Sequence, residues 1–154
     1  MKTTTEERFW AKVDKTGECW LWTASTGNRG YGYFRDGAAY KAHRFSFELA
    51  NGPIPLGLEV DHMCHVTACV NPAHLRLATR KQNQENLSGN RSNSTSGVRG
   101  VTWKKSHQKW EAQLSHNSRK VFVGLFSSLT EAEAAVTAKR LELFTHNDQD
   151  RKAS

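Results

Sequence analysis

Two cysteines and a histidine follow one another at five-residue intervals, at Cys64, Cys69 and His74, and the chain has one further cysteine, Cys19. Three thiols and one imidazole are a ligand set that suits tetrahedral Zn²⁺. The paired Cys-x-x-Cys spacing of common zinc ribbons is absent. A second interpretation therefore stays open, in which Cys64 and Cys69 are small buried residues and Cys19 packs beside Trp20.

A second group of polar residues surrounds this cluster. Asp61 and His62 are adjacent, and Asn83 follows His62 by 21 residues. Carboxylate and amide oxygens suit a hard cation such as Mg²⁺, and a neutral imidazole beside it can take a proton from water. Each residue alone has a simpler explanation, Asp61 as a cap and Asn83 as a surface residue. Taken together, they fit metal-assisted hydrolysis of a phosphodiester.

The charge of the chain indicates a polyanionic partner. Lys and Arg number 22 against 15 Asp and Glu, a net charge of +7. Residues 91–128 contain 7 basic residues and one acid, Glu111. Nucleic acid is the common partner of such a chain, and a merely soluble basic protein is the alternative.

Membrane and secreted classes do not fit the sequence. No apolar run approaches the ~20 residues that span a bilayer. The first twelve residues contain acids and Trp10 where a signal peptide has its apolar stretch. We therefore expect a cytoplasmic protein with reduced cysteines.

Composition divides the chain in two. Residues 86–97 are almost entirely Ser, Asn, Gly, Thr and Arg, which bury little and are typical of a linker. We expect a first domain over residues 1–86, a flexible linker over 87–96, a second domain over 97–146 and a disordered tail over 147–154. Neither half is large, so zinc binding would contribute folding free energy to the first.

Local patterns predict the elements of the first half. The Asp36-Gly37 pair predicts a hairpin between residues 30–34 and 40–43. Helices are expected over residues 6–13, 42–50 and within 72–85, and short strands over 19–22 and 59–62.

Residues 8–90 resemble the HNH family of the ββα-metal, or His-Me finger, nucleases, and especially the His-Cys-box homing endonucleases. The spacing of His62, Cys64, Cys69, Asn71-Pro72, His74 and Asn83 matches that family. The resemblance implies that His62 is the general base, that Asn83 and Asp61 bind the single catalytic Mg²⁺, with Mn²⁺ also suitable, and that His74 joins Cys19, Cys64 and Cys69 at a structural zinc. It also implies a basic residue that stabilises the cleaved phosphate, for which the nearest equivalents are Lys41 and Arg44.

The second half alternates polar and apolar residues. Strands are expected over residues 98–103, 109–114 and 120–126, followed by a helix that begins at Ser128 with a capping box to Glu131. This half resembles the plant APETALA-type, or ethylene-response-factor, DNA-binding domain, on Gly97-Val98-Arg99-Gly100-Val101, Lys109-Trp110-Glu111-Ala112, Val123-Gly124-Leu125-Phe126 and the helix 131–138.

That resemblance implies a sheet that enters the major groove of DNA. The implied contact residues are Arg99, Thr102, Trp103, Lys104, Gln113, Ser115, Lys120 and Phe122. Trp103 faces either the DNA or the core. Several arginines of the family are replaced by Thr102, Ser115 and Lys120, so its base preference does not transfer. A solvated sheet face is the alternative.

We therefore expect an α+β protein in which a zinc-stabilised ββα-metal nuclease domain precedes a small three-stranded antiparallel sheet with one packed helix. The expected function is metal-dependent, site-specific cleavage of double-stranded DNA by a homing endonuclease of a phage or mobile element, acting in the bacterial cytoplasm. A monomer is favoured over a homodimer, because no strongly apolar surface indicates a dimer. The alternatives are a DNA-binding protein whose nuclease fold is inactive and a non-specific nuclease.

Overall fold

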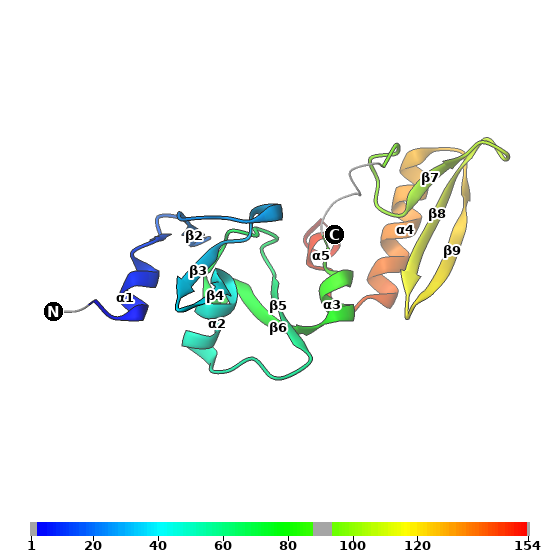
Figure 1. Cartoon of the computed structure of the whole chain (residues 1–154). Coiled ribbons are helices and arrows are strands. Elements are labelled where there is room, and N and C mark those ends of the chain that lie inside the picture. The colour runs from blue at the N-terminus through cyan, green and yellow to red at the C-terminus, as the bar shows by residue number, and fades with distance from the viewer. Residues whose placement is uncertain (1–2, 88–93, 154) are drawn as a thin grey trace. The chain divides into compact units, whose positions relative to one another are not determined.

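The computed structural model describes residues 3–87 and 94–153 and divides into two compact units, Met1–Asn83 and Gln84–Ser154 (Figure 1). Helices mixed with small antiparallel sheets confirm the expected α+β class. The boundary between the units falls within helix α3 (Arg80–Glu85). Of the expected linker, residues 88–93 lie outside the described part of the chain.

The first unit begins with small elements around an aromatic core. Helix α1 (Thr5–Trp10) starts with a capping box between Thr4 and Glu7. Strand β1 (Val13–Asp14) pairs with β2 (Leu21–Trp22). Strands β3 (Tyr33–Asp36) and β4 (Ala38–Lys41) form the expected hairpin, with Gly37 at a φ of +74°. Helix α2 (Ala42–Asn51) follows, and the core beneath these elements consists of Phe9, Trp22, Phe34, Ala42 and Val70.

A second hairpin and a helix complete this unit. Strand β5 (Leu58–His62) pairs antiparallel with β6 (Leu75–Thr79), and α3 follows β6 directly. The expected helical stretch within 72–85 is confirmed as α3, whereas residues 75–79 before it form the unexpected strand β6. Backbone pairing with β5 decides the conformation of these five residues.

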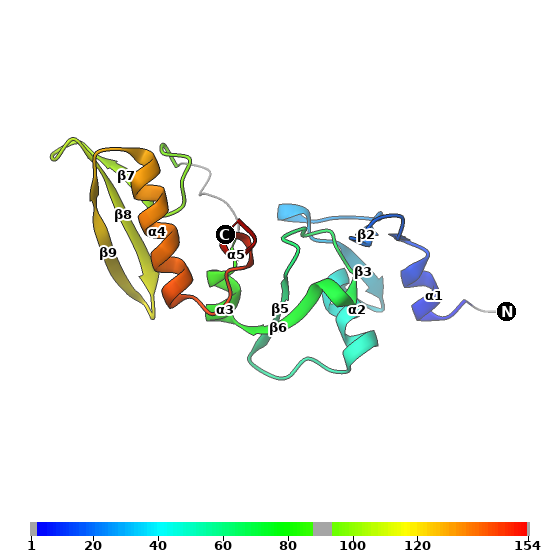
Figure 2. The ribbon, with the colours of Figure 1, turned by 180° about the vertical axis from the view of Figure 1, so that it is seen from behind.

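The second unit is a three-stranded sheet covered by one helix. Strands β7 (Val101–Lys104), β8 (Lys109–His116) and β9 (Arg119–Phe126) pair antiparallel in that order. Helix α4 (Leu129–Leu143) lies along one face in both views (Figures 1 and 2). The core between them includes Val101, Ala112, Leu114, Ala132 and Val136. The turn between β8 and β9 uses left-handed Asn117 and Ser118, with φ of 50° and 61°, which suits a two-residue hairpin.

The expectation of a disordered tail over residues 147–154 is corrected by the structure. Residues 148–153 form helix α5 (Asp148–Ala153), because Asp150 accepts two hydrogen bonds from the buried Arg140 and Asn86 Oδ1 accepts from Asp148 N. At the other end of the unit, Ser96 Oγ donates to Val101 O at 2.6 Å, so Ser96 belongs to the fold and not to a linker. None of the described helices is long and apolar enough to cross a membrane.

Candidate active site and metal centre

Cys19, Cys64, Cys69 and His74 gather at one point, with their ligand atoms all within 4.8 Å of one another. His74 Nδ1 lies 3.5 Å from Cys19 Sγ and 3.6 Å from Cys69 Sγ. Tetrahedral zinc with ordinary Zn–S and Zn–N bonds separates sulfur from nitrogen by about 3.5 Å. The donor set and its spacing are therefore compatible with a zinc site.

The loop between β5 and β6 brings three of these ligands together. Backbone pairing of Leu21 with Cys69 lays the Cys19 segment beside this loop. Asn71 fixes the part of this loop that leads to His74, because its Oδ1 accepts from Ala73 N and its Nδ2 donates to Glu18 O. The 3-10 helix that Asn71 caps, Pro72–His74, then presents the His74 ring to the thiols.

Hydrogen bonding within the cluster favours one thiolate. The hydrogen bond from Cys69 lowers the pKa of Cys64 well below the ordinary thiol value. The same contact, followed by burial, raises the pKa of Cys69, and burial raises that of Cys19. Asn71 N donates to Cys69 Sγ at 3.4 Å, a contact that also favours a sulfur anion.

His62 lies at the end of β5 and is buried, 6% exposed. Its Nε2 is 2.9 Å from the carbonyl oxygen of Cys69. A carbonyl only accepts, so Nε2 bears the hydrogen and Nδ1 has the lone pair. Burial lowers the pKa of His62, and the Cys69 carbonyl and the charges of Cys64 and Asp61 oppose that shift. The imidazole is therefore neutral near pH 7 and orientated by the metal-binding loop.

Two aromatic rings pack against His62. The His43 ring centroid is 4.8 Å from that of His62, and the Tyr31 ring lies 5.9 Å from His62 and 5.3 Å from His43. His43 is buried, and its Nδ1 has no hydrogen-bond partner among the described residues. Burial, followed by the charges of His62, Lys41 and Arg44, lowers its pKa to about 3. Sequence reasoning gave His43 no role, although it stands between the two basic candidates.

Two carboxylates share a face of β5, because side chains alternate along a strand. Asp61 is buried and accepts from Arg76, its cross-strand partner, with Nη2 to Oδ2 at 2.9 Å. Glu59 accepts from Asn83 Nδ2 on α3. Burial, followed by the charge of Asp61 and, more weakly, of Glu59, raises the pKa of Tyr31, so both acids act on the ring that contacts His62. Sequence reasoning missed Glu59 and Arg76, which the hairpin register alone places.

Lys41 and Arg44 stand at the start of α2. Lys41 is exposed, and its Nζ lies 5.3 Å from the centroid of the Tyr31 ring. Arg44 is half-buried, and its charge acts on His43 together with that of Lys41. Both therefore lie near the ring cluster, and Lys41 contacts it directly.

The sheet of the second unit has a face that α4 does not cover. This open face is defined by three cross-strand pairs, Thr102 with Glu111, Gln113 with Phe122 and Ser115 with Lys120. Phe122 is 62% exposed, although it is a large apolar side chain. Six of the eight expected contact residues lie on this open face: Thr102, Lys104, Gln113, Ser115, Lys120 and Phe122.

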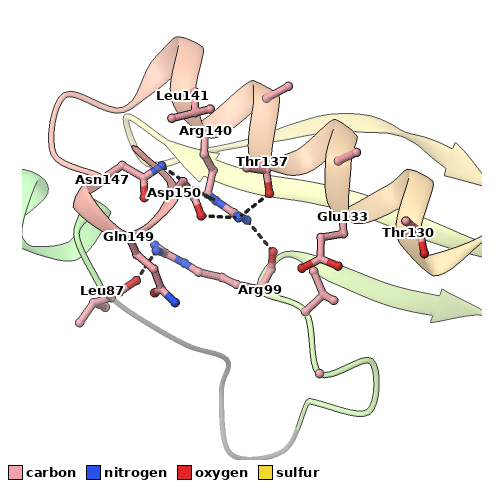
Figure 3. A pocket seen from close by; sticks show the side chains of 14 residues that line it. Leu87, Arg99, Thr130, Glu133, Thr137, Arg140, Leu141, Asn147, Gln149 and Asp150 are labelled. Atoms are coloured by element: carbon pink, nitrogen blue, oxygen red, sulfur yellow. Dashed lines mark hydrogen bonds and ion pairs between the residues drawn. The ribbon is translucent and has the colours of Figure 1, made fainter. Parts of the chain in front are cut away.

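Arg99 and Trp103 do not belong to this group of six. The Arg99 guanidinium donates to the backbone oxygens of Gln84, Glu85 and Leu87, so it completes the end of α3 and does not lie on the sheet. Figure 3 shows the bond to Leu87. Trp103 pairs with Trp110, and their rings are 5.0 Å apart. Trp110 packs against the core of the unit, whereas Trp103 is 42% exposed.

Arg99 also lines a pocket of about 640 Å³ in the second unit. Arg140 extends into the same region, where it binds Asp150, the backbone oxygen of Arg99 and Thr137 Oγ1 (Figure 3). Both guanidinium groups are thus bound to protein groups and stabilise this unit.

Comparison with known proteins agrees with the geometry of the first unit. Residues 40–85, which contain α2, the β5–β6 hairpin and α3, match the family described as HNH endonuclease. The chain belongs to the same family as Protein 3.8 of Escherichia phage T7, to which it is 38% identical over 88 residues, 52% of this chain and 72% of that protein.

Two further phage T7 proteins are similar. Protein 7.7 is 37% identical over 71 residues, and Protein 2.8 is 35% identical over 79 residues. These matches take in 46% and 49% of this chain, and the chain spans only about half of each relative, 55% and 52%. No solved structure matches the chain.

Proposed function

We propose that this chain is a metal-dependent DNA endonuclease in which His62 is the general base. The observation that supports this most strongly is the 2.9 Å contact from His62 Nε2 to the Cys69 carbonyl, which leaves Nδ1 as the basic nitrogen of a buried, neutral imidazole. The region that matches the HNH endonuclease family contains both His62 and Asn83. A zinc-stabilised fold without activity requires neither side chain, which favours the enzyme over the inactive alternative.

Asp61 and Asn83 would hold one divalent cation, Mg²⁺ or Mn²⁺, because both offer oxygen ligands and both lie beside Glu59 on one face of the hairpin. Such a cation supplies positive charge for the scissile phosphate and the leaving oxygen. His62 Nδ1 takes a proton from water, the water oxygen bonds to phosphorus, and the bond to the leaving oxygen breaks. Lys41 is favoured over Arg44 as the phosphate-stabilising group, because it contacts Tyr31.

Zinc at Cys19, Cys64, Cys69 and His74 would be structural. Four protein ligands leave no open position for substrate. Since the Cys69 carbonyl orientates His62, the same loop would stabilise the fold and position the base.

Cleavage of supercoiled plasmid tests the nuclease proposal. We expect wild-type protein loaded with zinc to nick or linearise plasmid with Mg²⁺ and not with EDTA. His62→Ala is expected to bind DNA without cutting it, and His107→Ala, which removes an exposed histidine from the second unit, is expected to cut normally. Folded, zinc-loaded wild-type protein that shifts DNA but never cuts it, across plasmids bearing target genes, would establish the DNA-binding alternative.

The second unit would bind DNA through its open sheet face, as in the APETALA-type domain that it resembles. Lys120 and Phe122 on β9 supply a cation and an exposed ring. We expect Lys120→Ala to weaken binding in gel shifts and to lower the salt dependence by about one phosphate contact. Lys139→Ala removes the same charge from α4 and is expected to leave both unchanged.

We further propose that this nuclease is a site-specific homing enzyme that acts in the host cytoplasm. The similarity to phage proteins supports this more specific proposal. Digestion of phage DNA is expected to give discrete fragments, and a smear would support a non-specific nuclease. We further propose that the active species is a monomer that nicks one strand. Sedimentation of the protein and of its DNA complex tests this, and a dimeric active species would contradict it.

A further inference from the structure

Glu59 is the acidic residue beside the active site that neither the base nor the cation ligands account for. It lies on β5 two residues before Asp61 and on the same face. The two acids have different partners. Asp61 accepts from the guanidinium of Arg76, whereas Glu59 Oε2 accepts from Asn83 Nδ2 at 2.5 Å. Glu59 thus binds the side chain that is proposed to hold the cation from α3.

The hydrogen bond between Glu59 and Asn83 allows only one orientation of the Asn83 side-chain amide. An ionised carboxylate only accepts, and a side-chain amide has a donating and an accepting end. Only the nitrogen of Asn83 can therefore face Glu59, and Oδ1 must point to the other side. Divalent cations bind amides through oxygen. Rotation of the amide by half a turn would put its nitrogen where the ligand oxygen belongs, and would set oxygen against the carboxylate.

We propose that Glu59 is a positioning residue that fixes the side-chain amide of Asn83 with Oδ1 towards the catalytic cation. This inference rests on the proposed function, because it assigns the cation to Asn83. Helix α3 is only six residues long, so an anchor from β5 also limits where its Asn83 side chain points. Partners of this kind typically change metal affinity about 10- to 100-fold when they are replaced.

Two variants separate positioning from simple attraction between charges. Glu59→Asp keeps the charge and shortens the side chain by one methylene, which breaks the hydrogen bond. Glu59→Gln keeps the length of the side chain and removes its charge. Attraction alone predicts that Glu59→Asp binds a cation like wild type and that only Glu59→Gln binds more weakly. Positioning predicts that Glu59→Asp also binds more weakly, because its carboxylate no longer reaches Asn83 Nδ2.

Mn²⁺ binding to the zinc-loaded full chain, followed by electron paramagnetic resonance, is the readout and does not depend on activity. We expect Glu59→Asp to bind Mn²⁺ at least tenfold more weakly than wild type. Glu59→Gln, which is isosteric, is expected to weaken binding even if Glu59→Asp fails to fold.

Two outcomes would overturn the inference: binding by Glu59→Asp within twofold of wild type, or unchanged binding by Glu59→Gln. Wild-type protein that binds no Mn²⁺ and cuts no DNA would instead contradict the proposed function. In nitrogen-15 spectra, the Asn83 side-chain amide is expected to shift in Glu59→Asp without any metal, which reports the hydrogen bond directly.

Discussion

Acidification is expected to destabilise the first unit through His43. This imidazole is 4% exposed, and burial, more than the neighbouring charges, lowers its pKa from 6.5 to about 3. The unfolded chain therefore binds a proton at a pH where the folded chain does not. The loss of stability begins as the pH falls through about 6.5 and grows until the pH reaches about 3. Between pH 7 and pH 5 it amounts to about 2 kcal/mol.

Urea unfolding at these two pH values, with zinc in slight excess, measures this contribution. Tryptophan fluorescence is suitable because Trp22 is buried in the core of the unit. His43→Phe keeps a ring against His62 and removes the titrating nitrogen. We expect the free energy of unfolding to fall by about 2 kcal/mol more in wild type than in His43→Phe. Comparing the two proteins cancels the effect of acid on the thiols and on His74.

The control is His107→Phe, which changes an exposed histidine and is expected to keep the pH dependence of wild type. An equal fall in stability for wild type and His43→Phe would refute the reasoning, because His43 would then titrate alike in both states. A larger fall in His43→Phe would show that the folded state stabilises charged His43, the opposite of what its burial implies.

Three further outcomes are expected. Cys69→Ser loses zinc and unfolds the first unit, as measured by zinc analysis and circular dichroism; a zinc-loaded, folded variant would contradict the structural role of the metal. The rate of DNA cleavage falls only below pH 6.5, because burial lowers the pKa of the base His62; an acid limb centred above pH 7 would contradict this. Arg140→Ala costs about 3–5 kcal/mol in urea unfolding, because it leaves the Asp150 carboxylate without its buried partner. The adjacent Lys139→Ala, which removes a half-buried lysine paired with the exposed Glu142, costs under about 1 kcal/mol.

Chemistry of the side chains made the metal cluster predictable. A tetrahedral zinc needs four soft or borderline ligands, and Cys19 is the only thiol available to join the group around Cys69, although 45 residues separate it from Cys64. Helix α4 was predictable for a local reason, since the Ser128 and Glu131 capping box forms as expected. Both conclusions depend on residue type or on short spacing alone.

The features that could not be predicted concern contacts between distant segments. Strand β6 at residues 75–79 was not expected and forms because β5 pairs with it. Helix α5 forms because Arg140 on α4 and Asn86 in the turn after α3 bind its first turn. Arg99 resembles a DNA contact in sequence, but three backbone oxygens up to 15 residues earlier bind its guanidinium. Local propensity contains no information about such partners.

The position of the metal-binding loop explains why a structural metal suits this unit. Its apolar residues form two separate clusters, one around Phe9 and Trp22 and another around Phe47 and Val60. The loop contributes Val70 to the first cluster, and Leu75, which follows it, belongs to the second. Closing a loop of this length costs conformational entropy. A metal bound at Cys69 and His74 would fix both ends of the Val70–Leu75 segment, and would thereby join the two clusters and set the carbonyl that orientates His62.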